Sequence, residues 1–191
     1  MESLKPLNVH ACGEVQLEVS SPADPKALTA DFTILDLADV NLPMFNEPCI
    51  PHQITDPDDY GQPHTRAWSK AVSKYSAFIF VTPQYNWGYP AVLKNAIDYL
   101  CNEWNGKPAM IVSYGGQGGT KSANQLRQVL EAVKMRVVET MPALAFPSRP
   151  IMYKAAMGED IGLVGEDGFW EVEGKEIQKA GREIMAILGE A

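Results

Sequence analysis

Two short stretches of this chain hold residue types that could bind a ligand. The stretch TPQYNWG (82–88) places planar rings and side-chain amides directly after an apolar run, and its candidate binding residues are Pro83, Gln84, Tyr85, Asn86 and Trp87. The stretch SYGGQGG (113–119) offers main-chain N–H groups with little side-chain bulk, and its candidates are Ser113, Tyr114, Gly115 and Gly116. Because glycine lets a ligand approach the backbone closely, this mixture suits a flat, heteroaromatic, hydrogen-bonding ligand better than a phosphate or a metal ion.

The same residues have a purely structural interpretation. Tyr85 and Trp87 could simply cover the hydrophobic core, while the glycines only turn the chain. Spacing alone leaves both interpretations open.

The elements around the two stretches predict that they are neighbours. The apolar runs 77–81 and 109–114 precede them without polar alternation, which is typical of strands covered on both faces. Strands alternating with amphipathic helices indicate a parallel α/β fold, in which ligands bind beyond the carboxyl ends of the strands. We therefore expect both stretches at one edge of the sheet.

The remaining elements follow from periodicity. A β-prone run covers 32–37, a proline-rich loop follows, and a helix is expected to begin at about 64 or 65. Further helices are expected from Tyr89 or Pro90 and after the glycine-rich stretch, with a third strand at 135–139. A final helix carries the apolar stripe Ile177, Ala180, Ile184 and Ile187. We interpret residues 1–191 as a single domain.

Composition narrows the class of partner. The net charge of −8 argues against nucleic acid and anionic membranes. Three cysteines without a CxxC pair fit a reducing compartment, and three histidines without ligand spacing argue against a structural metal site. No apolar run reaches the length of a membrane span, so we expect a cytoplasmic protein.

The stretch TPQYNWGYPAVLKNAIDYL (82–100) closely resembles the signature of the NADPH-dependent FMN reductase family, which includes quinone reductases and azoreductase-like proteins. KPAMIVSYGGQGG (107–119) and DFTILDLADVNLPMFNEP (31–48) resemble further segments of that family. The resemblance implies a flavodoxin-like three-layer sandwich with a central parallel sheet. It also implies a homodimer or homotetramer.

The family's chemistry implies roles at matching positions. The isoalloxazine of FMN would lie against the Pro83–Asn86 turn, and Ser113, Tyr114, Gly115 and Gly116 would flank its pyrimidine end. NADPH or NADH would give a hydride to the flavin, and a quinone or similar acceptor would then be reduced. No catalytic side chain and no metal is required, because the cofactor carries the chemistry. Two positions depart from the pattern: Gln84 stands where Glu is common, and Trp87 where a polar residue is often seen.

The first 30 residues depart most from the family. Its phosphate-binding GSxRxGR loop is not present, and the first arginine of the chain is Arg66. Val15, Leu17 and Val19 alternate as in a strand, but SSPADP (20–25) breaks the helix that should follow. The first strand and first helix of the fold are therefore expected to be atypical or replaced. Two or three lost charge-assisted hydrogen bonds would weaken FMN binding by roughly a hundredfold or more.

Several hypotheses follow. The leading one is an NAD(P)H-dependent FMN or quinone reductase with FMN as its cofactor, either bound weakly or lost. The alternatives are a flavin-free relative that uses the groove for another small aromatic ligand or reaction, and an inactive subunit that assembles with an intact paralogue. An altered N-terminus of an ordinary reductase would also explain residues 1–30.

Overall fold

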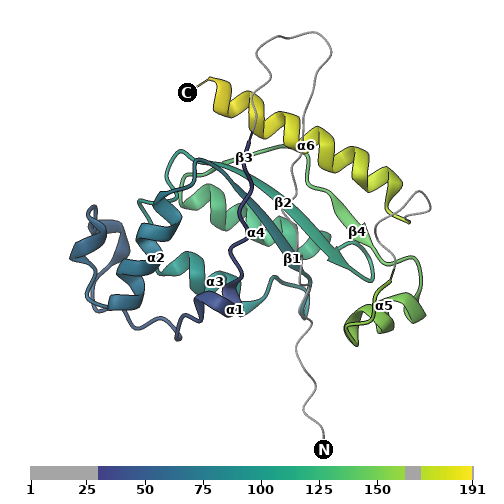
Figure 1. The fold of residues 1–191 in the computed structure, drawn as a ribbon, viewed down its shortest axis with the longest axis horizontal. Coiled ribbons are helices and arrows are strands. Elements are labelled where there is room, and N and C mark those ends of the chain that lie inside the picture. Colours follow the sequence, from purple (N-terminus) through teal and green to yellow (C-terminus); the bar gives the residue numbers. More distant parts are fainter. Residues whose placement is uncertain (1–29, 162–168, 191) are drawn as a thin grey trace, which may run out of the picture.

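The computed structural model describes residues 30–161 and 169–190, and the divergent segment 1–29 lies outside them. The sheet is parallel, with β1 (Phe78–Pro83) beside β2 (Pro108–Gly115), and β2 also pairs with β3 (Arg136–Val137) and β4 (Ala143–Ala145) (Figure 1). The helices are α1 (Leu37–Val40), α2 (Pro63–Ser73), α3 (Ala91–Asp98), α4 (Thr120–Ala132), α5 (Arg149–Ala156) and α6 (Glu171–Gly189). Two 3₁₀ turns, η1 (Pro51–Gln53) and η2 (Pro57–Asp59), lie in the proline-rich loop.

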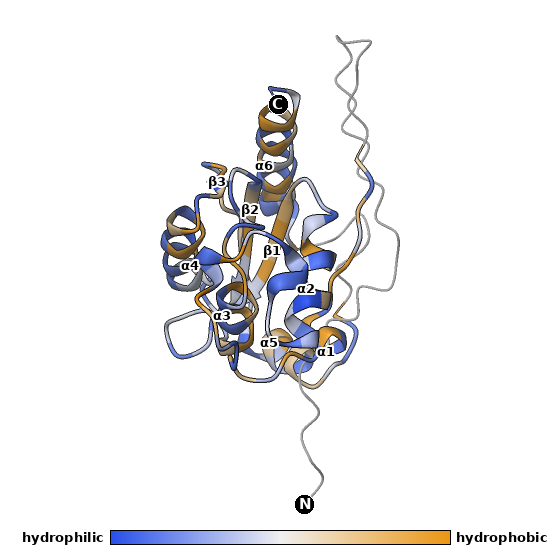
Figure 2. Cartoon of the chain, turned by 90° about the vertical axis from the view of Figure 1, so that its left-hand side faces the viewer, coloured by the Kyte–Doolittle hydropathy of each residue, from blue (hydrophilic) through white to orange (hydrophobic). Residues whose placement is uncertain are grey.

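Strand β2 separates two hydrophobic clusters. Ala109 and Ile111 belong to one cluster, with residues of α2, α3 and α4, whereas Met110 and Val112 belong to the other, with Ala180 and Ile184 of α6. Figure 2 shows a largely hydrophobic β1 beside helices that carry both hydrophobic and hydrophilic residues. This arrangement gives three layers, because successive residues of a strand point to opposite faces. It confirms the predicted α/β sandwich and explains why 109–114 is apolar without alternation.

The described residues cover strand β1 on one face only. Phe78 and Phe80 pack against Trp104, with ring centroids 5.1 and 6.2 Å from it. On the other face Ile79 and Val81 are 38% and 63% exposed, because the described helix of that layer, α6, lies mainly against β2. The expectation that this strand is buried on both faces is therefore wrong for the described part of the chain.

The predicted strand at 32–37 is also wrong. Residues 30–36 have no regular structure, and α1 begins at Leu37, capped by the Asp36 carboxylate, which accepts the N–H of Ala38 at 2.8 Å. A β-prone run forms a strand only beside a partner, and no described strand lies beside this one. The strand predicted at 135–139 is shorter than expected, because only Arg136 and Val137 pair with β2.

The helix starts agree with the expectations to within about two residues. Helix α2 begins at Pro63, and α3 begins at Ala91 with Pro90 as its N-cap. Strand β4 and helix α5 were not anticipated. Ser148 before "RP" is a readable start signal for α5, since its hydroxyl accepts the N–H of Ile151 at 3.4 Å.

Two side chains of the LKNAIDY segment hold the proline-rich loop. Asn95 Nδ2 donates to the carbonyl oxygen of Pro43 at 2.7 Å, and Asn95 Oδ1 accepts the N–H of Phe45 at 2.9 Å. The Tyr99 hydroxyl donates to Asn46 Oδ1 at 2.9 Å. These bonds satisfy loop groups that would otherwise be half-buried and unpaired. The helix that follows the first candidate stretch therefore also fixes a segment some fifty residues earlier in sequence.

Candidate functional site at the carboxyl edge of the sheet

The two candidate stretches lie side by side, as predicted. In the parallel register Thr82 pairs with Ser113 and Pro83 with Tyr114, so both strands end at the same edge. Beyond the strands, the Gln84 N–H donates to the carbonyl oxygen of Tyr114 at 3.2 Å. The site is therefore assembled by sheet pairing, from segments about thirty residues apart.

Residues Tyr85 to Gly88 form a tight two-residue turn. The Tyr85 N–H donates to the Gly88 carbonyl at 2.8 Å, and the Gly88 N–H donates back at 3.0 Å. The central residues are both left-handed, with φ of 47° at Asn86 and 74° at Trp87, which corresponds to a type I′ turn. Tyr85 and Trp87 are 56% and 65% exposed, so they do not cover the core as the structural interpretation requires.

The glycines of the second stretch divide into two pairs. Gly118 and Gly119 have φ of 76° and 77°, and an added Cβ would lie 2.9 Å from the Ala143 carbonyl oxygen and 2.8 Å from that of Tyr114. These two glycines are required by the turn itself. An added Cβ would have more room at Gly115 and Gly116. At Gly116 its nearest atom would be the Met152 sulfur, at 3.3 Å. Gly115 and Gly116 therefore leave room for a ligand above the backbone.

Hydroxyl and amide side chains brace the two stretches. The Ser113 hydroxyl donates to the Gly118 carbonyl at 2.7 Å, and the Ser122 hydroxyl donates to that of Pro83 at 3.0 Å. Gln84 Oε1 accepts the N–H of Lys121, in the first turn of α4, at 3.1 Å. Ser113 and Gln84 thus position the edge and use part of their hydrogen-bonding capacity in doing so.

Several main-chain donors at this edge are not used internally. Among the described residues, no hydrogen bond engages the N–H groups of Asn86, Trp87, Gly116 or Gln117. A flat heteroaromatic ring with carbonyl oxygens matches such donors beside exposed planar side chains. The donor set therefore fits an isoalloxazine ring.

The two candidate stretches themselves are uncharged. Neither 82–90 nor 113–119 contains Asp, Glu, His, Lys, Arg or Cys. Burial raises the pKa of the Tyr114 hydroxyl, and the nearby Tyr85 raises it further. Tyr114 is consequently neutral at physiological pH. The two stretches can therefore bind and orient a ligand, and neither contributes a Cys nucleophile or a His–carboxylate pair.

Helix α5 borders the site, and the sequence prediction missed it. Met152 lies against Gly116, and Phe146, just before the helix, donates its N–H to the Gly115 carbonyl at 3.1 Å. Tyr153 of the same helix is exposed. The signal that could have revealed α5 was the Ser-Arg-Pro sequence at 148–150.

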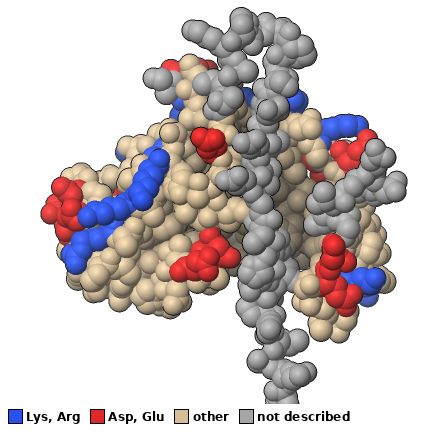
Figure 3. Space-filling view, viewed as in Figure 1, with Lys and Arg blue, Asp and Glu red and all other residues tan. Residues whose placement is uncertain are grey.

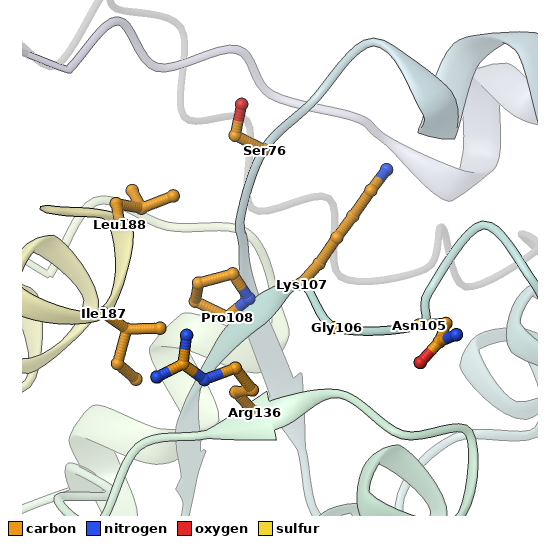
Figure 4. Close-up of a pocket in the computed structure, with 8 residues that line it drawn as sticks. All are labelled: Ser76, Asn105, Gly106, Lys107, Pro108, Arg136, Ile187 and Leu188. Atoms are coloured by element: carbon orange, nitrogen blue, oxygen red, sulfur yellow. The ribbon is translucent and has the colours of Figure 1, made fainter. Parts of the chain in front are cut away.

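A hollow of about 430 Å³ lies at the opposite end of the sheet, between Ser76, Pro108, Arg136 and Leu188 (Figure 4). Its cations are already engaged, because Arg136 pairs with Glu190 at 2.8 Å and Lys107 donates to the Val72 carbonyl at 3.0 Å. Figure 4 shows the Lys107 side chain pointing away from Arg136 and Leu188. The unused main-chain donors lie instead at the carboxyl edge.

Among the described residues, neither the distribution of charge nor the metal-ligating side chains indicate a competing site. On the face seen in Figure 3, acidic and basic side chains are interspersed, without a broad basic surface among the described residues. Lys94 and Asp98 form an exposed ion pair at 2.6 Å, as expected for a surface pair. No group of three His, Cys, Asp or Glu suited to a metal occurs in the described ranges. No helix within those ranges combines the length and apolarity needed to cross a bilayer.

Comparison with known proteins agrees with this geometry. The family model described as NADPH-dependent FMN reductase matches residues 17–147. The chain belongs to this family. The match includes both candidate stretches and the strands before them.

Individual relatives support the assignment. An NAD(P)H-dependent FMN reductase of Schizosaccharomyces pombe is 52% identical over 122 residues, covering 64% of this chain and 60% of the relative. One from Saccharomyces cerevisiae is 51% identical over 107 residues, covering 55% of this chain and 56% of the relative. The chain thus spans less than two thirds of these two relatives. One from Nectria sp. is 40% identical over 159 residues, covering 81% of this chain and 78% of the relative.

A solved structure supports the fold. The flavoenzyme FerB, an NAD(P)H:(acceptor) oxidoreductase from Paracoccus denitrificans, matches with a TM-score of 0.55 at 20% identity. The match covers 83% of this chain and 81% of FerB. At this identity the likeness concerns the three-layer α/β architecture alone.

Proposed function

We propose that the protein is an NAD(P)H-dependent FMN reductase that reduces a quinone or a similar acceptor. In the overall reaction NAD(P)H and a proton reduce the quinone to its hydroquinone and leave NAD(P)⁺. FMN, when bound, supplies the two-electron chemistry. The observation that carries the proposal is the pair of uncharged stretches at one sheet edge, with unused main-chain donors and exposed rings, in a chain of this family.

The candidate residues of the two stretches have different roles in binding the isoalloxazine ring. Pro83, Gln84, Tyr85, Asn86 and Trp87 form one wall, and Ser113, Tyr114, Gly115 and Gly116 border the pyrimidine end. Within this set the N–H groups of Asn86 and Gly116 are open to a ligand, whereas Gln84 and Ser113 hold the two loops in register. The two stretches contain no charged residue, so they themselves offer the FMN phosphate no cation.

Weak binding of the FMN phosphate stays a prediction. The divergent segment 1–30 falls, except for Ala30, outside the described residues, so the predicted replacement of the first strand and helix is not tested there. We expect FMN to bind more weakly than in a protein with the GSxRxGR loop. No observation favours a flavin-free relative or an inactive subunit.

We take residues 1–191 as one domain, expect a homodimer or homotetramer in the cytoplasm, and leave both NADPH and NADH as donors. The exposed apolar side chains Met44, Phe45, Val92 and Tyr153 are compatible with contacts between subunits.

The test is a titration of the full chain with FMN, followed by NADPH oxidation with 1,4-naphthoquinone as acceptor. We expect saturable quenching of flavin fluorescence and acceptor-dependent NADPH oxidation. Gly116→Val, which places a branched side chain above the open backbone, should raise the Kd for FMN at least tenfold. Gly181→Ala, on α6 with no atom within 4 Å of the added carbon, serves as the matched control. A chain that neither binds FMN nor oxidises NADPH with added FMN refutes the proposal.

A further inference from the structure

Trp87 differs from the other described tryptophans. Trp68 and Trp104 are buried, and their Nε1 atoms donate to the Ala96 carbonyl at 2.8 Å and the Ile97 carbonyl at 3.2 Å. Trp170 Nε1 donates to the Ala145 carbonyl at 2.7 Å. Trp87 is 65% exposed, and within the described part of the chain its indole makes no hydrogen bond or ring contact. Its ring therefore adds nothing to the packed core.

The backbone at Trp87 is also unfavourable for tryptophan. Its φ of 74° lies in the left-handed region, at the second central position of a type I′ turn, where glycine is preferred. A large side chain at this position costs conformational energy, and exposing an indole to water gains none back. With glycine at position 87, the fold should be equally stable or more stable.

The turn that carries Trp87 is held firmly. Two backbone hydrogen bonds join Tyr85 and Gly88, and Gln125 of α4 fills the space beside Gly88, where an added Cβ would lie 2.8 Å from its Oε1. A rigid turn presenting a large, exposed aromatic ring is a feature of binding surfaces, because little side-chain entropy is lost on contact.

We propose that the indole of Trp87 is the stacking surface for the planar acceptor and thereby sets acceptor specificity, an inference that rests on the proposed function. A neutral quinone offers a flat ring and two carbonyl oxygens, and both stretches of the site are uncharged. Its affinity must therefore come largely from ring contact. NAD(P)H depends less on Trp87, because its ribose and phosphate groups supply further contacts.

The decisive variant is Trp87→Gly, with Trp87→Phe as the conservative variant. Lys134→Gly is the matched control, because Lys134 is also left-handed, with φ of 63°, and lies exposed between α4 and β3. The measurements are the Kd of 1,4-naphthoquinone for the oxidised FMN complex by calorimetry, the Tm of the protein without flavin, and the KM values for naphthoquinone, ferricyanide and NADPH.

We expect Trp87→Gly to raise the Kd and KM for naphthoquinone about 3- to 10-fold. The KM values for NADPH and for ferricyanide, which is not planar, should rise less than the KM for naphthoquinone. Trp87→Phe should recover most of the affinity. Both glycine variants should keep the wild-type Tm or raise it by up to about 4 °C, because each removes backbone strain.

Two results would overturn the inference. In one, Trp87→Gly binds naphthoquinone like the wild type. In the other, Trp87→Gly lowers the Tm while Lys134→Gly does not, which assigns the ring a structural role. Failure of the proposed function would give a different result. In that case neither the wild type nor the variants at position 87 would oxidise NADPH with any acceptor.

Discussion

Two polar regions of the molecule use their hydrogen-bonding groups in opposite ways. Around α2, buried groups are paired with one another: Glu103 accepts from Tyr60 at 3.0 Å and from Ser69 at 2.5 Å, and Glu47 accepts the N–H of Gly61 at 2.6 Å. At the carboxyl edge of the sheet, the donors of Asn86 and Gly116 stay open to solvent. Internally paired groups stabilise a fold, whereas a rigid edge with open groups is suited to a ligand.

The largest effect is expected from the paired region. Glu103→Ala removes the acceptor of two buried hydroxyls, those of Tyr60 and Ser69, and should lower the free energy of unfolding by about 3 kcal/mol. Urea unfolding measures this loss. The Kd for naphthoquinone should not change in the folded fraction.

Glu103→Gln keeps one carbonyl acceptor and should lose less stability than Glu103→Ala. Burial, followed by the neighbouring Glu103 charge, raises the pKa of Tyr60, so its hydroxyl remains a donor throughout the neutral range. Equal stability of Glu103→Ala and the wild type would remove the distinction between the two regions.

The next largest effect lies inside the site, at a glycine that serves the fold. Gly119→Ala forces a left-handed alanine whose Cβ lies 2.8 Å from the Tyr114 carbonyl oxygen, and should cost about 2 kcal/mol or more. Thermal unfolding followed by circular dichroism gives the measurement. Gly174→Ala, in α6 with open space around it, should be neutral or slightly stabilising. If both variants have the same Tm, Gly119 is not held as tightly as its contacts imply.

Sequence reasoning found the edge of the sheet because that edge depends on local patterns. The apolar run before Ser113 and the break after Val81 are visible in the residue types, and parallel pairing then brings the loops together. The strand expected from Phe32 failed because strand formation depends on a neighbour rather than on propensity.

Other features could not be foreseen for a different reason. The left-handed backbone at Trp87 contradicts the preference of tryptophan, so residue type gives no hint of it. The contact between Met152 and Gly116 joins segments 36 positions apart that no periodicity connects. The ligand-binding roles of the nine candidate residues remain predictions, because geometry shows access to the edge rather than occupancy.

The smallest effect concerns a carboxylate that is paired but nearer the surface. Burial raises the pKa of Glu183, but hydrogen bonds from the Thr140 hydroxyl at 2.6 Å and the Thr140 N–H at 3.0 Å, with Lys179 nearby, outweigh it and hold the pKa below its ordinary value. A carboxylate with a lowered folded-state pKa stabilises the protein above its unfolded-state pKa. That contribution is lost as the pH falls through the folded-state pKa. Urea unfolding of wild type and Glu183→Gln between pH 7 and pH 3 should therefore show a difference of about 1 kcal/mol at neutral pH that disappears toward pH 3. If the difference in unfolding free energy is constant across this range, the hydrogen bonds from Thr140 do not depend on the charge of Glu183. They would then contribute as much as hydrogen bonds between neutral groups.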